Sequence, residues 1–367
     1  MNFIERPLYM DKLIGSIKNN RIKILSGVRG VGKTSILKMF QEKLNPDETI
    51  YIDFESAEYF FITESVGLYE HLSGKITPTE FRYLILDEIQ RIKDWQKVIA
   101  ALKTDFNVDI YIAVSRTNNL EELGDVTLIE ILPLSFKESQ CENFEEYLNG
   151  SMPAIITKDS NKVSDIFYSA IAQDVLIANK IADNDVLMLL LRILISETGK
   201  IHSFNSLSKL LNEVVEKAPA VRTIESYIKF LTDARIIYNV PVFDFKSDHQ
   251  LSRYAKYYPC DLGFYKIIMG RINLTDIHIL ESVIYFELLR LNVKVTTGKS
   301  VSFIAENNDN KIYVQVSGRQ WKRRNVIKPI RTIKDHYSKW ILTLDETYTH
   351  SKDGIRIINI EDFLREE

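Results

Sequence analysis

Cysteine is scarce in this sequence, which has only Cys141 and Cys260 among 367 residues. Two cysteines so far apart predict neither a disulfide framework nor a zinc cluster built on thiolates. Long apolar runs are also missing: the longest, 186–195, is interrupted by Arg192 and is far shorter than the roughly 20 residues that span a bilayer. Residues 1–11 lack the apolar core of a signal peptide. We therefore expect a cytoplasmic protein with no membrane partner.

A charge excess of either sign is absent as well. The formal net charge is −3, from 47 Lys+Arg and 50 Asp+Glu, so a nucleic-acid partner would have to meet a local patch. The six histidines are isolated, and no zinc-binding spacing or Gly-x-Ser-x-Gly nucleophile motif occurs. With 45% apolar and 26% charged residues, the composition is that of a globular protein and excludes a disordered or coiled-coil chain.

The first third of the chain alternates β-branched runs with helical stretches. Strands separated by helices indicate an α/β fold with a parallel sheet covered on both faces. The expected strands are 21–26, 49–54, 82–87, 108–115 and 127–132, and the first expected helix is 34–44.

The pattern changes after Pro133 and again near residue 250. Helical periodicity dominates 134–235, with helical spacing expected at 185–198, 207–214 and 223–234 and an extended segment at 236–245. Three short helices followed by a two-stranded element resemble a winged helix-turn-helix. The last hundred residues indicate a third α/β module. Its expected elements are an amphipathic helix at 281–291, strands at 301–305, 311–316, 339–344 and 354–359, and a helix at 327–337. The predicted domains are 1–150, 151–250 and 251–367.

A glycine-rich loop stands between the first expected strand and its helix. Positions 27–34 fit G-x-x-x-x-G-K-S/T throughout, as Gly27, Val28, Arg29, Gly30, Val31, Gly32, Lys33 and Thr34. Glycines let backbone N–H groups surround phosphate oxygens, and the helix start adds a favourable dipole. We predict a phosphate-binding loop that extends to Ser35, in which Lys33 reaches the terminal phosphates and Thr34 ligates Mg²⁺.

An acidic pair, Asp87 and Glu88, follows the apolar run 83–86. A strand ending there brings Asp87 to the sheet edge, where it can hold Mg²⁺ through water, and places Glu88 to activate an attacking water. Ser115, which ends the fourth strand, is a candidate catalytic contact to the γ-phosphate or that water. The acidic pair favours ATP hydrolysis over small-molecule kinase chemistry. No Asn-Lys-x-Asp motif for reading guanine occurs, so we expect ATP rather than GTP.

Together these residues resemble a known family, the prokaryotic AAA-type P-loop ATPases with a C-terminal domain of unknown function and restriction-endonuclease-like topology. The resemblance covers nearly the whole chain and implies an ATP-binding core, a winged-helix middle and a nuclease-like end. The residues that carry it, besides the loop, are 6–9 (Arg-Pro-Leu-Tyr), 53–55 (Asp-Phe-Glu), 86–90 (Leu-Asp-Glu-Ile-Gln), Trp95, 132–136 (Leu-Pro-Leu-Ser-Phe), 256–258 (Lys-Tyr-Tyr), 261–263 (Asp-Leu-Gly) and Glu281.

Several positions depart from the family pattern. At 113–116 the family has Thr-Gly-Ser-Asn, whereas this chain has Ala-Val-Ser-Arg and lacks the Asn that would poise water. Asp125 follows Gly124, where the family has a Gly-Arg pair whose Arg could act on a neighbouring nucleotide. In the third module, Ser302 replaces a metal ligand and 313–317 offers no carboxylate or lysine. We therefore expect slow or partner-stimulated hydrolysis and a nuclease-like fold without nuclease chemistry.

Two segments are candidates for contact with duplex DNA. From Lys311 to Lys339 there are nine Lys/Arg and one acid, with Trp321 among them, so this basic C-terminal segment could contact phosphates while Trp321 stacks on a base. The expected recognition helix of the winged helix carries Arg222, Thr223, Glu225, Ser226 and Lys229. The acidic segment 121–146 could instead meet the basic end of another copy, as a homo-oligomer or with a protein partner.

The sequence thus predicts an ATP-binding, Mg²⁺-dependent ATPase of AAA type. Lys33, Ser115 and Glu88 are the catalytic candidates, and Thr34 and Asp87 are the metal candidates. The γ-phosphate state would bias the arrangement of the winged-helix and C-terminal modules. The alternative is a DNA- or protein-binding switch that holds ATP without hydrolysing it.

Overall fold

The computed structural model describes residues 4–156, 160–181, 183–216, 219–244, 249–273, 276–308, 310–345, 350–352 and 354–366. The chain divides into two compact units: unit 1 comprises 1–132 with 233–235, and unit 2 comprises 133–232 with 236–367. In the described ranges, no helix combines the length and apolar character that crossing a bilayer requires.

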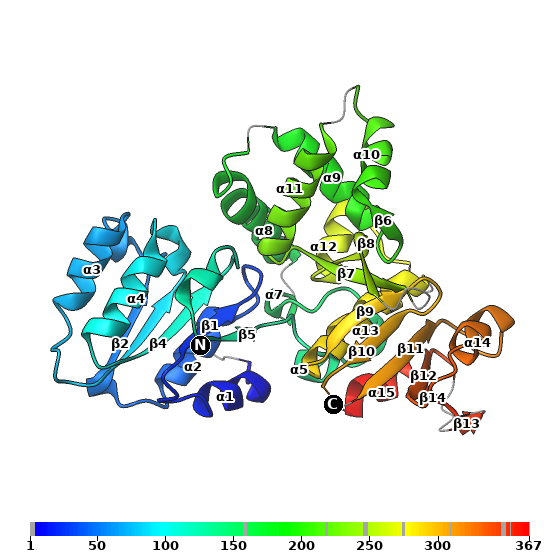
Figure 1. The fold of residues 1–367 in the computed structure, drawn as a ribbon, viewed down its shortest axis with the longest axis horizontal. Helices are drawn as coiled ribbons and strands as arrows, with labels where there is room; N and C mark the ends of the chain where they lie inside the picture. Colours follow the sequence, from blue (N-terminus) through cyan, green and yellow to red (C-terminus); the bar gives the residue numbers. More distant parts are fainter. Residues whose placement is uncertain are drawn as a thin grey trace. The chain divides into compact units, whose positions relative to one another are not determined.

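Unit 1 is built on a five-stranded parallel sheet with the strand order β2-β3-β4-β1-β5 (Figure 1). The expected α/β fold is confirmed, and each expected strand lies within two residues of its observed bounds. The strands are β1 (Ile22–Ser26), β2 (Thr49–Asp53), β3 (Arg82–Asp87), β4 (Val108–Val114) and β5 (Val126–Glu130).

Helices pack on both faces of this sheet. Ile110, Ile112 and Val114 of β4 join an apolar cluster with α3 and α4. Tyr111 points to the opposite face, because side chains alternate along a strand, and its ring centroid lies 4.7 Å from that of Phe40 on α2. The helical elements of unit 1 are α1 (Pro7–Ile14), α2 (Lys33–Gln41), η1 (Pro46–Glu48), η2 (Ala57–Tyr59), α3 (Ser65–Ser73), η3 (Ile89–Arg91), α4 (Trp95–Asp105) and η4 (Leu120–Leu123).

A short segment from later in the chain, 233–235, completes unit 1. The backbone N–H of Thr117 donates to the carbonyl oxygen of Asp233 over 3.1 Å. Arg235 forms an ion pair with Glu130, with 2.8 Å between Nε and Oε1. The segment therefore lies against the loop that follows β4 and the end of β5.

Unit 2 contains a nine-stranded mixed sheet with the order β13-β14-β12-β11-β10-β9-β7-β8-β6. β7 pairs with both β8 and β9, so one sheet joins the second and third predicted domains, whose boundary at residue 250 falls within β8. The strands are β6 (Ile201–Ser203), β7 (Ile237–Asp244), β8 (His249–Pro259), β9 (Lys294–Gly298), β10 (Phe303–Glu306), β11 (Lys311–Ser317), β12 (Ser338–Thr343), β13 (His350–Lys352) and β14 (Ile355–Asn359).

Helices fill the first half of unit 2 and separate its later strands (Figure 1). Phe245, the last residue of the expected extended segment 236–245, lies outside the described residues. The helices are α5 (Phe136–Ser139), α6 (Phe144–Tyr147), α7 (Pro153–Ile156), α8 (Ser160–Ser169), the π-helix η5 (Ala170–Ile177), α9 (Asn184–Ser196), α10 (Phe204–Asn212), α11 (Val221–Asp233), α12 (Leu262–Met269), α13 (Ile277–Arg290), α14 (Arg324–Arg331) and α15 (Ile360–Glu366).

Two expectations for unit 2 need correction. The helix expected at 281–291 is not amphipathic: residues 279–288 of α13 are all buried, because the helix packs inside the unit. The strands β6, β8, β9 and β13 were not predicted. β8 carries His249, Arg253 and Lys256 among its aromatic residues, so it lacks the uniform β-branched run by which the other strands are recognised.

Candidate nucleotide site

Three strands of unit 1 bring the predicted site residues to one edge of the sheet. β1 and β3 each pair with β4 in parallel, with Ser26 opposite Val114 and Asp87 opposite Ala113. Parallel strands end at the same edge, which is where open α/β sheets bind ligands. The glycine-rich loop after β1, the acidic pair at the end of β3 and Ser115 after β4 therefore meet.

The loop has a conformation that depends on its glycines. An added side chain at Gly27 would place its Cβ 2.5 Å from the carbonyl oxygen of Ile131, so the loop starts too close to the backbone after β5 for any larger residue. Gly30 and Gly32 have φ angles of 78° and 103°, a region that other residues rarely adopt. Val28 and Val31 are buried and anchor the loop.

Lys33 opens α2 and is 4% exposed. Its ammonium donates to the carbonyl oxygens of Gly27 and Val28, at 3.0 and 3.3 Å, and to the Ser115 hydroxyl at 2.8 Å. It also lies 3.3 Å from Oε1 of Glu88. The cation is therefore folded back onto its own loop, one hydrogen bond from the acidic pair.

The backbone of Glu88 is in the left-handed conformation, with φ 54°. Four neighbouring side chains contact its carboxylate. The Ser115 hydroxyl lies 2.8 and 3.0 Å from its two oxygens, and the Gln90 amide also donates to it. Burial alone would raise the pKa of Glu88, but the charges of Lys33 and Arg29, together with the hydrogen bonds from Ser115 and Gln90, outweigh burial and hold that pKa below its ordinary value. A strained backbone that aims a charged side chain is a common feature of functional sites.

Asp87 is fully buried beside Glu88. Its Oδ2 accepts a 3.0 Å hydrogen bond from the Tyr51 hydroxyl, whereas Oδ1 has no hydrogen-bond partner. Burial raises the pKa of Asp87 to about 6, and the negative charge of the adjacent Glu88 acts in the same direction. Buried charged oxygens are normally paired or bound to a metal, so the bare Oδ1 fits a cation ligand.

Three side chains that the motifs alone did not indicate, Tyr51, Gln90 and Glu55, join the site. Tyr51 holds Asp87, and Gln90 holds Glu88. Arg29, inside the loop, donates to Glu55 at 2.6 Å and lies 3.8 Å from Oε2 of Glu88. Glu55 and Gln90 belong to segments that carry the family resemblance, which was the available signal. Tyr51 in the middle of a strand gave none.

The N-terminal segment that also carries the resemblance braces the loop from outside. Arg6 is 4% exposed and donates to the carbonyl oxygens of Leu132, at 2.9 Å, and Val31, at 3.4 Å. The Tyr9 hydroxyl accepts from the Leu132 N–H at 3.0 Å. Arg6 therefore links the loop, at the Val31 carbonyl, to the backbone after β5, at Leu132, and Tyr9 adds a second bond to Leu132.

The donor set fits the nucleotide and metal that the sequence predicts. Thr34 and Asp87 offer hydroxyl and carboxylate oxygens, the ligands that Mg²⁺ prefers, on adjacent elements. Gly27 to Ser35 surround the start of α2, where an anion is favoured, and Lys33 supplies a movable cation. The roles of these residues stay predictions; what the structure contributes is that Lys33, Ser115, Glu88 and Asp87 are neighbours.

Unit 2 has a second buried polar cluster, centred on Glu281, which is 4% exposed. Lys256 forms an ion pair with Glu281 at 2.8 Å, the Tyr258 hydroxyl donates at 3.0 Å, and His278 lies 3.3 Å away. Burial would raise the pKa of Glu281, but hydrogen bonds from His278, Lys256 and Ser302 outweigh it and hold that pKa below its ordinary value. Its charge is therefore neutralised within the protein.

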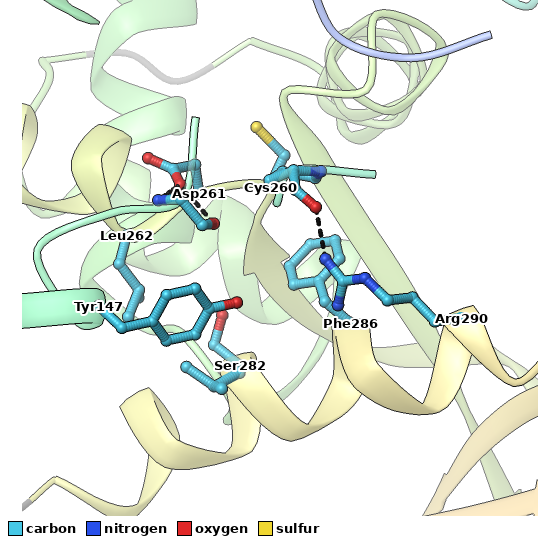
Figure 2. Close-up of a pocket in the computed structure, with 10 residues that line it drawn as sticks. Tyr147, Cys260, Asp261, Leu262, Ser282, Phe286 and Arg290 are labelled. Atoms are coloured by element: carbon cyan, nitrogen blue, oxygen red, sulfur yellow. Dashed lines mark hydrogen bonds between the residues drawn. The ribbon is translucent and has the colours of Figure 1, made fainter. Parts of the chain in front are cut away.

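A small pocket lies beside this cluster, between α6 and α13 (Figure 2). Its volume is about 20 Å³, enough for a single water. Asp261 on its wall accepts hydrogen bonds from the Ser151 hydroxyl, at 2.8 Å, and the Gly263 N–H, at 2.7 Å. Arg290 donates to the Pro133 carbonyl. Residues from two segments that carry the resemblance, 132–136 and 261–263, line this pocket. Its polar groups form hydrogen bonds within the protein, which stabilise the packing of these segments.

Comparisons with known protein families divide the chain near residue 141. Residues 19–140 match the model of an AAA domain. Residues 142–274 match the model of a domain of unknown function, DUF8612. Residues 19–140, most of which lie in unit 1, therefore match an AAA domain, which supports the expected AAA-type core. The restriction-endonuclease-like assignment of the C-terminal residues stays a prediction.

Relatives of similar length match most of the chain. An uncharacterised protein of Haemophilus influenzae is 29% identical over 98% of both chains. An uncharacterised protein of Methanocaldococcus jannaschii is 26% identical over 94% of this chain and 85% of its own. Among solved structures, the Walker-type ATPase of Pyrococcus abyssi covers 72% of this chain and 96% of its own, with 14% identity and a TM-score of 0.49.

Proposed function

We propose that this protein hydrolyses ATP to ADP and phosphate in a Mg²⁺-dependent reaction. One observation carries the proposal: a continuous hydrogen-bonded cluster joins Lys33, Ser115 and Glu88 at the sheet edge, directly beside Asp87 with its unpartnered oxygen. Each residue type that hydrolysis requires lies within reach of the next. The guanine-reading motif is missing, which favours ATP.

The cluster supports a specific division of roles. Lys33 exchanges its loop carbonyls for the terminal phosphates, and the N–H groups of the loop bind the remaining phosphate oxygens. Thr34 and Asp87 hold Mg²⁺, which supplies positive charge that offsets the phosphates. Glu88, whose pKa is held low by Lys33 and Arg29, is a carboxylate at neutral pH and accepts a proton from water. Ser115 keeps Glu88 oriented.

The same contacts support slow or partner-stimulated turnover. When Lys33 turns from its loop carbonyls to the phosphates of a nucleotide, its charge moves away from Glu88 and lowers the pKa of Glu88 less. The pKa of the base therefore depends on whether Lys33 binds phosphate. Arg116, which occupies the position of the family's Asn, donates to the Gln90 carbonyl at 3.0 Å and so does not serve as an amide that poises water. These features motivate the alternative, a switch that holds ATP without hydrolysing it.

Unit 2 is the proposed partner-binding part. The order α9, β6, α10, α11, β7, β8 supports a winged helix, and α13, β9, β10, β11, α14, β12 supports a nuclease-like topology without nuclease chemistry, since Ser302 accepts from the Val316 N–H and Lys256 neutralises Glu281. We propose that the nucleotide state biases the arrangement of these modules and that duplex DNA, a protein or a second copy is the partner.

The test is phosphate release from Mg-ATP by the wild-type protein and Glu88→Gln, each with and without duplex DNA. We expect release by the wild type and loss of about 10²–10⁴-fold in the variant, the usual contribution of a positioned base. Glu122→Gln, at an exposed position of η4, is the matched control and should behave as wild type. Equal release by wild type and Glu88→Gln, with ATP still bound, would favour the non-hydrolysing switch.

The binding role of the loop is tested separately with Lys33→Ala and a fluorescent ATP analogue. Loss of the cation that reaches the phosphates should weaken nucleotide binding, whether or not the protein hydrolyses it. Unchanged affinity would show that the phosphate site is assigned wrongly.

A further inference from the structure

The helix α14 borders a groove of about 520 Å³ whose walls are mostly cationic. We define the α14 groove by its seven lining residues, five of which are Lys or Arg. They are Lys322, Arg324, Ile327, Lys328, Arg331, Thr332 and Lys334. A second hollow of about 500 Å³ adjoins it and shares Thr332 and Lys334, so the concave surface continues beyond the groove.

The sequence of α14 fixes these cations on a rigid support. Val326 and Ile330 are buried in an apolar cluster that also contains Trp321, which attaches one side of the helix to the sheet of unit 2. Arg324 and Lys328 are four residues apart, so they lie on one face of the helix about 6 Å apart along its axis. The exposed face is therefore a row of positive charges that cannot turn away from solvent.

Carboxylates are scarce along this row. The stretch 320–334 contains no Asp or Glu. The next acid, Asp335, accepts from the Tyr313 hydroxyl at 2.5 Å and from Lys339 at 3.2 Å. Asp345 accepts from the backbone N–H groups of Gln320 and Trp321, at 3.0 and 2.9 Å. A concave surface with an excess of one sign of charge concentrates the potential and attracts a polyanion.

The composition of the groove distinguishes between kinds of polyanion. Trp321, which we expected to stack on a base, is 8% exposed and packs in the apolar cluster, so that expectation is wrong. None of the described lining residues is aromatic, whereas proteins that bind single strands usually stack bases on aromatic side chains. The groove suits the phosphate backbone of a duplex, which is read by Lys and Arg without regard to sequence.

The other candidate DNA surface, helix α11, is weaker by the same criteria. Its exposed face carries Arg222 and Lys229, but Glu225 is exposed between them. The net charge of that face is +1, against five cations in the α14 groove.

We propose that the α14 groove binds the backbone of duplex DNA without sequence preference and is the principal DNA contact of this protein. This inference rests on the proposed function in one respect, because the proposed function includes duplex DNA among the partners of unit 2. Since the groove lies wholly in unit 2, DNA binding does not require bound nucleotide.

The test measures fluorescence anisotropy of a labelled duplex of mixed sequence, without nucleotide, over a series of salt concentrations. The triple variant Arg324→Gln, Lys328→Gln, Lys334→Gln removes three exposed cations. We expect its affinity at low salt to fall by about tenfold or more. The slope of log K against log salt should decrease by about one for each phosphate that the protein no longer neutralises. A single-stranded oligonucleotide of the same length should bind more weakly than the duplex.

A matched variant separates position from net charge. Lys43→Gln, Lys75→Gln, Lys97→Gln removes three exposed cations from unit 1 and should bind DNA as wild type does, as should Arg222→Gln, Lys229→Gln on α11. An equal loss in the unit 1 variant, no loss in the α14 variant, tighter binding of the single strand, or tighter binding of polyglutamate than of the duplex would each overturn the proposal.

Phosphate release without DNA is measured on the same samples. We expect the α14 variant to match the wild type, because its changes lie outside the nucleotide site. If the wild-type protein releases no phosphate, the proposed ATPase function fails while the anisotropy result still decides the role of the groove.

Discussion

Each unit contains a buried lysine–glutamate pair, and the two pairs are chemically similar. Lys33 and Glu88 approach to 3.3 Å in unit 1, and Lys256 and Glu281 approach to 2.8 Å in unit 2. Both glutamates are almost fully buried, both have a pKa below the ordinary value, and both bond a serine hydroxyl, Ser115 or Ser302.

What differs is the setting of the lysine. Lys33 bonds carbonyl oxygens of a loop that contains two glycines with positive φ, and phosphate oxygens can replace those carbonyls. Lys256 extends from strand β8 to α13, and the Tyr258 hydroxyl from the same strand bonds the same carboxylate. The comparison teaches that a buried ion pair becomes a ligand site only where the surrounding backbone offers an exchangeable bond.

The largest expected effect comes from breaking the first pair. Lys33→Met keeps the apolar stem but removes the charge that we propose contacts phosphate in the transition state. We expect ATP hydrolysis to fall by about 10²–10³-fold, the usual cost of one such contact. Steady-state phosphate release measures the effect. Glu88 keeps Arg29, Ser115 and Gln90 as neighbours, so the variant should fold, which circular dichroism would confirm.

The same Lys→Met substitution in the pair of Lys256 and Glu281 should lower stability and leave phosphate release unchanged. Lys256→Met leaves Glu281 buried without its cation, and removal of one partner of such a pair costs about 3–5 kcal/mol. Urea unfolding should show this loss, while phosphate release per folded molecule stays at the wild-type value. A stable Lys256→Met protein, or one that folds but no longer hydrolyses ATP, would contradict the structural role of this pair.

The serines test the comparison with smaller changes. Ser115→Ala and Ser302→Ala each remove a hydroxyl that bonds a buried carboxylate, and each should lower the free energy of unfolding by about 1.5–3 kcal/mol. Only Ser115→Ala should also slow phosphate release, by about tenfold, because Glu88, and not Glu281, is the residue that we propose acts on water. Measuring both quantities on both variants decides the point. A rate loss in Ser302→Ala would show that the two clusters are not independent.

The sequence predicted the first pair well and the second poorly, for a physical reason. A phosphate loop requires glycines, lysine and threonine at fixed spacing, so Gly27 to Thr34 predict a phosphate site without a structure. Asp87 and Glu88 end an apolar strand, which places them at the same edge. Lys256 and Glu281 lie 25 positions apart on elements with no motif. Their pairing depends on how β8 packs against α13, and β8 itself was not predicted.

The smallest expected effect is a pH dependence of stability that belongs to the second pair. The pKa of Glu281 lies below its ordinary value of 4.5 because His278, Lys256 and Ser302 outweigh burial. Between the folded and unfolded pKa values the unfolded chain binds more protons, so stability rises with pH there. The contribution is complete above about pH 4.5 and is lost as the pH falls through the folded pKa.

Urea unfolding at a series of pH values from neutral to acid measures this slope. One proton contributes at most about 1.4 kcal/mol per pH unit, and Glu281→Gln should remove its share of the slope while it lowers stability at neutral pH. Glu122→Gln, at an exposed position, should leave the slope unchanged. An identical acid slope in wild type and Glu281→Gln would mean that Lys256 holds Glu281 no more tightly than water does. That result would contradict the view that Lys256 and Glu281 form a fixed ion pair, in contrast to the exchangeable pair of Lys33 and Glu88.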